Sequence, residues 1–246
     1  MNWQLNRICR HPIKAHGRED LASVLLSEGA CLPDDRRWAV AHDAARLVPG
    51  WNPCRNFHRG AKAPQLMAIT ARLEGDCITL SHPDRPDLTF RPDAVEDLPG
   101  FLDWVAPLSP PDRARPARIV SAGCGMTDSA FPSISILNLA SLRALSERMG
   151  VELSADRFRG NLWFDGPAAF EEFDWIGRRL KIGDAVLEIR ERITRCRATM
   201  ANPETGRIDA DTLKALQENW GHRDFGLYAV VVETGKVALG DKVVLQ

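Results

Sequence analysis

The sequence predicts a mainly β fold with a few helices, and three observations support this class. Short segments of alternating or β-branched apolar residues recur along the chain, separated by turns that contain glycine and proline. Far fewer segments carry apolar residues at helical spacing. A stretch with four prolines between positions 107 and 116 is the best linker. We therefore expect an N-terminal β-barrel-like domain over residues 1–106, packed on a C-terminal β-barrel domain over residues 107–246.

The N-terminal part is expected to consist mainly of short strands. Its first strand should cover residues 5–13 and end before a turn around Gly17. Further apolar and β-branched segments fall at 22–27, 37–43, 65–72, 77–82 and 87–91. Strands of this length and spacing are typical of sandwiches and barrels. A brief helical pattern at 98–105 ends this part.

The C-terminal part contains the clearest strand of the chain. Between Leu187 and Ile193, apolar residues alternate with Glu188, Arg190 and Arg192. This period of two is the pattern of a strand with one buried face. Other strands are expected at 117–122, 134–136, 162–164, 228–233, 237–239 and 242–245.

Two helices are also expected in the C-terminal part. Asn138 is a good N-cap for a helix with apolar residues at 139, 142, 145 and 149, and Gly150 is suited to end it. The second helix is expected over residues 211–220, with Asp209 as its N-cap and Gly221 at its end. The apolar spacing in both helices indicates one buried face.

Composition and charge exclude several classes of protein. The chain is 44% apolar and 26% charged, which is ordinary for a soluble globular protein. Its formal net charge of −1 gives no bulk attraction for nucleic acid or an anionic membrane. The N-terminus has no apolar run of signal-peptide length, and no segment approaches the ~20 apolar residues of a membrane span. We therefore expect a cytoplasmic protein that binds neither nucleic acid nor membrane.

The six cysteines form no Cys-x-x-Cys pair and no cysteine–histidine cluster with zinc-site spacing, so most should be reduced structural thiols. Cys196 differs because it lies between Arg195 and Arg197, just past the alternating strand. If the alternation continued, its thiol would lie on the polar side, and nearby cations favour the nucleophilic thiolate. The alternative is a small, inert residue at a strand end. Local chemistry leaves both interpretations open.

Several other residues are candidates for binding an anion. Lys14 follows the first strand, Arg36 and Arg37 lie in an Asp-Asp-Arg-Arg loop, and Arg159 and Asn161 precede the strand at 162–164. Guanidinium groups match the geometry of phosphate oxygens, and an amide can add a neutral hydrogen bond. Each of these residues also has an ordinary interpretation as a solvated surface group.

Several of these segments together resemble the MOSC domain, named for the C-terminal region of molybdenum cofactor sulfurase. The resemblance lies in residues 157–161 (RFRGN), 171–177 (EEFDWIG), 194–199 (TRCRAT), 202–206 (NPETG), 224–228 (DFGLY) and 237–241 (VALGD). Upstream, residues 10–14 (RHPIK) and 32–40 (LPDDRRWAV) are similar to the β-barrel domain that precedes MOSC in many members. The motifs occur in the family's order and span nearly the whole chain.

The resemblance implies a molybdenum pterin cofactor (Mo-molybdopterin) and assigns roles to individual residues. Cys196 corresponds to the family's proposed metal ligand or sulfur-carrying residue, and it would be the catalytic residue. The family's best-described enzymes are amidoxime-reducing components, which take oxygen from N-hydroxylated small molecules. The implied cofactor-binding residues are Lys14, Arg36, Arg37, Ser141, Arg159, Asn161 and Arg195.

Three functions stay open at this point. A reductase of N-hydroxylated compounds would need a separate electron-donor protein, because the chain has no iron–sulfur cysteine set and no G-x-G-x-x-G motif. A sulfur carrier would hold a persulfide on Cys196 and work with a pyridoxal-phosphate cysteine desulfurase, to which relatives of this domain are fused. The third function is a cofactor-binding module without turnover.

Overall fold

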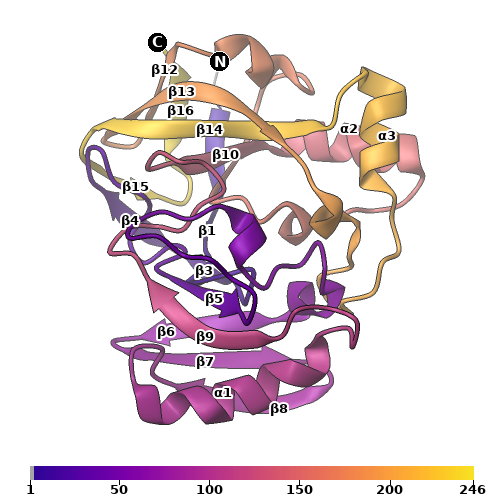
Figure 1. Cartoon of the computed structure of the whole chain (residues 1–246). Coiled ribbons are helices and arrows are strands. Elements are labelled where there is room, and N and C mark those ends of the chain that lie inside the picture. The colour runs from indigo at the N-terminus through magenta and orange to yellow at the C-terminus, as the bar shows by residue number, and fades with distance from the viewer. Residues whose placement is uncertain (1–2) are drawn as a thin grey trace.

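The computed structural model describes residues 3–246 and confirms the mainly β class. In Figure 1 the strands β10, β12, β13, β14 and β16 lie at one end of the molecule, and the strands β6, β7 and β8 lie with helix α1 at the other. Both chain ends lie at the first of these ends, so the chain leaves this end early and returns to it later.

A closed barrel of seven strands forms one end of the described chain. Its closure depends on an antiparallel pairing between β1 and β11, which places Ile8 opposite Leu162. Strand β3 (Glu19–Leu21) extends the sheet from the other edge of β1. Large buried side chains such as Trp163 and Phe225 fill the interior. In sheet order the barrel strands are β11 (Leu162–Asp165), β10 (Ile134–Asn138), β14 (Asp224–Glu233), β13 (Ala185–Thr194), β12 (Arg179–Ile182), β16 (Lys242–Leu245) and β1 (Trp3–Arg10).

Strands from both sides of the expected boundary after residue 106 pair with each other. Besides the place of β1 in the barrel, β4 (Ser23–Leu26) pairs with β15 (Gly235–Ala238). In a separate three-stranded sheet, β5 (Trp38–His42) lies between β2 (Ile13–Lys14) and β9 (Pro116–Ser121). The N-terminal segment therefore runs out of the barrel directly into this sheet.

The far end of the molecule is a three-stranded antiparallel sheet covered by a helix. Strands β6 (Thr70–Glu74), β7 (Cys77–His82) and β8 (Arg85–Phe90) form the sheet, and α1 (Leu98–Val105) packs beside β8 and β9. The expected strand at 65–72 is wrong in its first half, because Pro64–Ala68 forms a 3-10 helix. Pro64, which lacks a backbone N–H, occupies the first position of that helix, where no donor is needed.

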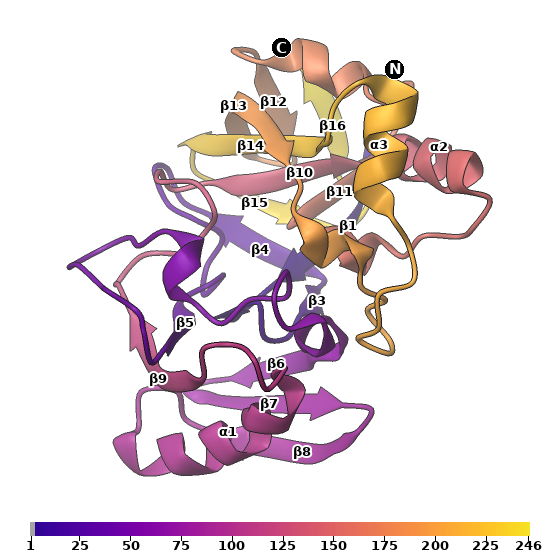
Figure 2. The same ribbon diagram turned by 45° about the vertical axis from the view of Figure 1, so that its right-hand side comes forward.

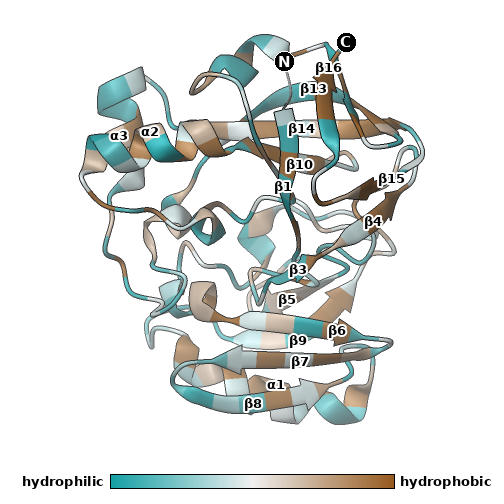
Figure 3. Ribbon diagram, turned by 180° about the vertical axis from the view of Figure 1, so that it is seen from behind, coloured by the Kyte–Doolittle hydropathy of each residue, from teal (hydrophilic) through white to brown (hydrophobic). Residues whose placement is uncertain are grey.

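Helices α2 (Leu139–Met149) and α3 (Thr212–Trp220) lie side by side against the barrel (Figure 2). Both show mixed bands of polar and apolar residues in Figure 3, as expected for helices with one buried face. Asn138 caps α2 by accepting from the Ala140 amide, and Gly150 ends it in the left-handed conformation, as predicted. No helix within residues 3–246 is long and apolar enough to cross a membrane.

The N-cap of α3 is a correction to the sequence prediction. The side chain of Asp211, and not that of Asp209, accepts a hydrogen bond from the Lys214 amide. Asp209 instead forms an ion pair with Arg157 at 2.7 Å. A carboxylate beside a buried arginine has a stronger partner there than a helix amide, and the cap moves to the next acidic residue in the chain.

Candidate functional site

A cavity of about 260 Å³ opens where the barrel meets the sheet that carries β2 and β5. Its walls come from segments spread between residues 14 and 228, so it exists only in the folded chain. The lining includes cations, two thiols, one acidic residue and one phenol. These chemically active residues are Lys14, Arg36, Arg59, Arg157, Arg159, Arg195, Cys54, Cys196, Asp128 and Tyr228.

The structure brings together most of the residues that the sequence nominated for a site. Five of them line this one cavity, namely Lys14, Arg36, Arg159, Arg195 and Cys196. They are separated by up to 182 positions in the sequence, taking Lys14 and Cys196 as the ends (196 − 14 = 182). Their convergence in one pocket is independent support for a common role.

Cys196 lies directly after β13, at the first turn of a 3-10 helix over Arg197–Met200. Its side chain is exposed, yet the surrounding cavity walls desolvate the sulfur enough to raise the pKa of the thiol. The negative charge of Asp128 adds to this increase, while the Ala198 amide and Arg195 oppose it. In the protein alone, desolvation by the cavity walls therefore outweighs the charge of Arg195 and favours the protonated thiol. A bound cation would reverse the balance, because a coordinated thiol loses its proton.

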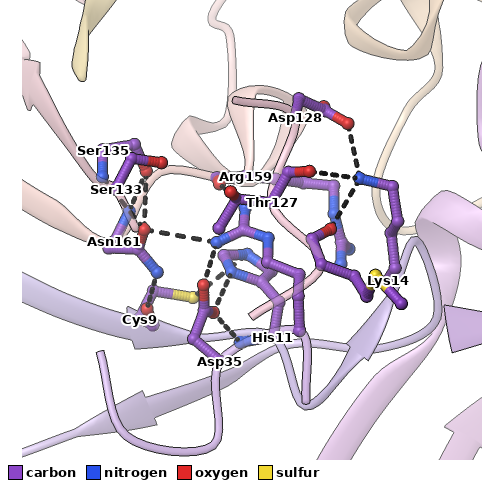
Figure 4. Close-up of polar contacts among 12 residues, drawn as sticks. Cys9, His11, Lys14, Asp35, Thr127, Asp128, Ser133, Ser135, Arg159 and Asn161 are labelled. Atoms are coloured by element: carbon purple, nitrogen blue, oxygen red, sulfur yellow. Dashed lines mark hydrogen bonds and ion pairs between the residues drawn. The ribbon is translucent and has the colours of Figure 1, made fainter. Parts of the chain in front are cut away.

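All three hydrogen-bond donors of the Lys14 ammonium group are used within the protein. Its Nζ donates to the carbonyls of Met126 and Thr127 at 2.8 and 3.2 Å, and to Asp128 Oδ1 at 2.5 Å. Figure 4 shows these three contacts converging on the ammonium group. Because an ammonium has three protons, Lys14 has no donor left for a ligand. It anchors the segment that carries Asp128 to the cavity wall.

Arg36 is engaged in a similar way. Its guanidinium pairs with the buried Asp35 and donates to Asn161 Oδ1 at 3.2 Å and to the Arg159 carbonyl at 2.8 Å. Burial alone would raise the pKa of Asp35, but the charge of Arg36 and the hydrogen bond from His11 hold it well below its usual range. Arg36 and Asp35 therefore form a buried ion pair at the cavity floor.

Asn161 lies behind this ion pair and does not line the cavity. Its Oδ1 accepts from the Ser135 amide and hydroxyl at 3.1 and 2.8 Å, and its Nδ2 donates to the Cys9 carbonyl at 3.1 Å (Figure 4). The amide thus joins β10, β1 and the loop before β11. The structure places Asn161 as a support for Arg36.

Arg159 and Arg195 differ from the engaged cations because each keeps a free donor. Arg159 donates through Nη2 to the Gly17 carbonyl at 3.0 Å, but its Nη1 is buried without a partner in the described chain. Arg195 donates to the Phe225 and Phe158 carbonyls at 2.7 and 2.9 Å, and its Nη2 is likewise unpartnered among residues 3–246. Burial lowers the pKa of Arg159 to about 9 and that of Arg195 to about 10.

The backbone is strained at the same cavity. Of the five non-glycine residues with positive φ in residues 3–246, three line it: Ala15, Arg36 and Arg159. Such conformations cost on the order of 1 kcal/mol each and collect at functional sites. The loop of Arg159 is also pressed against β10, since a Cβ on Gly160 would lie 2.2 Å from Leu137 Cδ1. A larger residue at this position would have to displace the buried Leu137 side chain, which favours glycine between Arg159 and Asn161.

Two of the nominated residues lie away from the cavity. Arg37 pairs with Asp34 at 3.1 Å and lies 4.4 Å above the Trp38 ring, with its own side chain largely exposed. Ser141 is buried in α2, where its hydroxyl donates to Glu172 at 2.7 Å and accepts from the Phe170 amide at 2.8 Å. These contacts tie α2 to the segment before β12.

Five chemically active residues of the cavity were not among the nominated ones: Arg59 and Arg157, and also Tyr228, Asp128 and Cys54. Tyr228, the only tyrosine of the chain, lies in the Asp-Phe-Gly-Leu-Tyr motif, and burial raises its pKa to about 12. Asp128 had no sequence signal, because its partner Lys14 is 114 positions away. Cys54 also had none, and its Sγ accepts from Arg59 Nη1 at 3.1 Å. Tyr228 could have been nominated from its sequence motif, whereas the positions of Asp128 and Cys54 in the cavity depend on the fold.

Comparison with known proteins agrees with this architecture. The model of the MOSC domain matches residues 128–244, and that of the MOSC N-terminal beta barrel domain matches residues 2–100. The chain belongs to the MOSC family. This MOSC protein is 25% identical to mitochondrial amidoxime reducing component 2 of Bos taurus, with 85% of the chain and 72% of the relative covered.

Two further relatives are similar to different shares of the chain. Mitochondrial amidoxime-reducing component 1 of Mus musculus is 26% identical, with 96% of this chain and 80% of the relative covered. Molybdenum cofactor sulfurase of Drosophila grimshawi is 31% identical over 94 residues, which are 38% of this chain and 12% of that protein. The similarity to the amidoxime reducing components thus covers both domains, and that to the sulfurase covers a part.

Proposed function

We propose that this MOSC protein binds a molybdenum pterin cofactor in the cavity, with Cys196 as the metal ligand, and reduces N-hydroxylated small molecules. The similarity to amidoxime reducing components over both domains supports the reaction class. The physical support comes from the cavity itself, which gathers a thiol and several cations around a space of about 260 Å³.

The observation that carries the proposal is the pair of buried donors on Arg159 and Arg195 that have no partner in the described chain. Buried polar groups are almost always hydrogen-bonded, and an unsatisfied one costs about 1–3 kcal/mol. Both guanidinium groups line the cavity, where a phosphate would supply several acceptors at once. The donor set therefore fits an anionic group such as the phosphate of a pterin cofactor.

The residues that line the cavity would have different roles in binding the cofactor. Cys196 offers a soft sulfur, which suits molybdenum better than a hydroxyl or carboxylate would. Arg159 and Arg195 would bind the anionic end of the cofactor, and the engaged Lys14 and Arg36 would keep the walls in place. When bound, the metal would supply the oxygen-atom chemistry, while the protein orients the substrate beside it.

The electron balance requires a partner. Reduction of an N–OH group to N–H breaks the N–O bond, consumes two electrons and two protons, and releases one water. The sequence contains no iron–sulfur or dinucleotide motif to supply those electrons. We therefore include a separate electron-donor reductase in the proposal. The high pKa of Tyr228 keeps its hydroxyl protonated near neutral pH, so it can donate a hydrogen bond in the cavity.

Replacement of Cys196 tests this function. Protein made with cofactor available should reduce an N-hydroxylated test substrate with an artificial electron donor, and Cys196→Ala and Cys196→Ser should both lose this activity. The serine variant should fail because a hydroxyl is a poor substitute for an ionised thiolate. Cys77→Ala, in β7 and outside the cavity, is the matched control. Wild-type turnover in the Cys196 variants, normalised to folded protein, would contradict the proposal.

A second candidate function is sulfur carriage, and one observation favours it. Cys54 lines the same cavity as Cys196, so a persulfide on Cys196 would have a second thiol nearby. The partner would then be a pyridoxal-phosphate cysteine desulfurase. Incubation with such an enzyme and cysteine should load about one labile sulfane sulfur per chain, and the Cys196→Ala variant should load none. Metal bound without any turnover would instead indicate a non-catalytic cofactor-binding module.

A further inference from the structure

Two buried histidines lie beneath the cavity wall and take no part in the function described above. His16 Nε2 lies 3.1 Å from His58 Nδ1. On one side His16 Nδ1 lies 2.8 Å from the Lys14 carbonyl, and on the other His58 Nε2 lies 2.8 Å from the Ser109 hydroxyl. Neither histidine lines the cavity, and both are buried.

The chemistry of the two ends fixes the direction of every hydrogen bond in this chain. A carbonyl only accepts, so His16 must carry its proton on Nδ1 and donate to Lys14. Its Nε2 is then an acceptor, and His58 donates to it from Nδ1. His58 Nε2 in turn accepts from the Ser109 hydroxyl. All four ring nitrogens are satisfied when both rings are neutral and carry the proton on Nδ1.

The surroundings favour that neutral state. Burial lowers the pKa of His58 to about 4, and His42 adds to the decrease. Burial also holds the pKa of His16 well below its usual range, with a further contribution from His58. This series of hydrogen bonds ends on the Lys14 carbonyl, which has no proton to exchange, so it does not deliver a proton to the cavity. Its role must therefore depend on the segments that it connects.

The histidines join two segments of the cavity wall from behind. His16 follows Lys14 and Ala15, which line the cavity, and His58 precedes the lining residues 59–61. The second segment lies close to the turn that carries Cys196, since a Cβ on Gly60 would be 3.5 Å from Ala198 Cβ. The His16–His58 hydrogen bond is thus a direct link between the wall of Lys14 and the wall of residues 59–61, which lies near the Cys196 turn.

We propose that His16 and His58 are positioning residues whose neutral hydrogen-bonded link fixes the spacing of these two walls and thereby the width of the cavity beside Cys196. The width of the cavity sets which small molecules reach Cys196, so the link is a determinant of substrate size. This last consequence rests on the proposed function, whereas the link between the walls does not.

The spacing of the walls can be tested without any ligand. Cys54 lies on the same wall as Arg59, so its rate of alkylation by a small neutral reagent, resolved by mass spectrometry, reports on loosening of that wall. We expect His58→Leu to raise the Cys54 rate at least about fivefold under native conditions. His58→Asn, which keeps a donor near the Nδ1 position, should restore the rate to within about twofold of wild type.

A buried histidine elsewhere supplies the matched control. His82 accepts from the Asp84 amide at 3.1 Å and contacts the Gln65 carbonyl at 3.2 Å, and it does not line the cavity. His82→Leu should therefore leave the Cys54 rate unchanged. A wild-type Cys54 rate in His58→Leu, or an equal acceleration in His82→Leu, would overturn the proposal.

The wild-type protein provides a second test that does not depend on any variant folding. Long-range ¹H–¹⁵N spectra of histidine rings distinguish the two neutral tautomers, and both His16 and His58 should show Nδ1–H at pH 7. A proton on Nε2 of either ring would break the directed chain and overturn the proposal. Because neither test uses molybdenum or pterin, failure of the proposed function would be seen separately, as absence of metal in the wild-type protein.

Discussion

Among the six described cations that line the cavity, two pairs differ in what their donors do. Lys14 and Arg36 donate to groups of the protein itself, namely Asp128, Asp35 and backbone carbonyls. Arg159 and Arg195 each keep one buried nitrogen without a partner in the described chain. The first pair builds the cavity, and the second pair is available to a ligand. Residue type alone does not distinguish the two roles.

The difference has an energetic meaning. Breaking a buried ion pair by removing one partner costs about 3–5 kcal/mol, because the remaining charge stays desolvated. An unpartnered guanidinium donor carries its desolvation cost in the free protein and recovers it when an anion binds. Changes to the first pair should therefore reduce stability, while changes to the second should reduce affinity. The following predictions test this division, from the largest expected effect to the smallest.

Removal of both free guanidinium groups should have the largest effect. A charge-assisted hydrogen bond contributes about 1.5–3 kcal/mol, so Arg159→Ala combined with Arg195→Ala should weaken cofactor binding by about 100- to 10,000-fold. The free energy of unfolding should change by about 2 kcal/mol or less, because lost bonds to carbonyls are offset by removal of buried charge. Cofactor titration and denaturant unfolding measure the two effects. A large loss of stability with unchanged affinity would reverse the assignment of the pair.

Asp35→Asn should show the opposite behaviour. It leaves Arg36 buried without its counter-charge, so we expect the free energy of unfolding to fall by about 3–5 kcal/mol at neutral pH. Asp34→Asn is the matched control, since Asp34 makes only partly exposed pairs with Arg10 and Arg37. Its cost should be about 1 kcal/mol or less. If the two variants were equally stable in urea, the cavity floor would not depend on the buried pair.

Local patterns in the sequence predicted much of the fold because their causes are local. The alternation from Leu187 to Ile193 became the barrel strand β13, with all three of its apolar residues buried. The caps at Asn138 and Gly150 were also correct, since capping needs only neighbouring residues. The 3-10 helix that begins at Pro64 was missed, because apolar runs of this length fit a strand equally well.

The site was predictable in its members but not in their roles. The family motifs nominated Arg36, Arg159, Arg195 and Cys196, which do meet at the cavity. Which cation is free depends on partners far along the chain, such as Asn161, which lies 125 positions from Arg36. The raised pKa of the Cys196 thiol has the same kind of origin, because the walls that desolvate it come from distant segments.

Acidification should destabilise the folded protein through His58, which precedes the cavity-lining residues 59–61. The pKa of His58 is lowered from 6.5 to about 4, so between these values the unfolded chain binds a proton that the folded protein does not. Stability should therefore fall as pH drops through this window, by about 1.4 kcal/mol per pH unit for this histidine. Urea midpoints at several pH values should show a steeper decline for wild type than for His58→Leu. The stability contributed by the ionised Asp35 should decline only below about pH 4, where the unfolded carboxyl begins to bind a proton that folded Asp35 does not.

Arg37→Ala should have the smallest effect. Arg37 carries the same charge as its neighbour Arg36, but it forms an exposed ion pair with Asp34 outside the cavity. Exposed pairs contribute about 0–1 kcal/mol, so stability should change little and cofactor affinity should stay within about twofold of wild type. A loss of affinity comparable to that of Arg159→Ala would show that the ligand extends beyond the cavity as described.

The central claim is that the cavity holds a molybdenum cofactor through Cys196 and the free arginines. The most direct measurement is the molybdenum content per folded chain in protein produced with the cofactor available, together with the number of sulfur neighbours of the metal from X-ray absorption. We expect close to one molybdenum per chain in the wild type and one fewer sulfur neighbour in whatever metal Cys196→Ala retains. Metal-free wild-type protein, or an unchanged sulfur count in Cys196→Ala, would contradict the account.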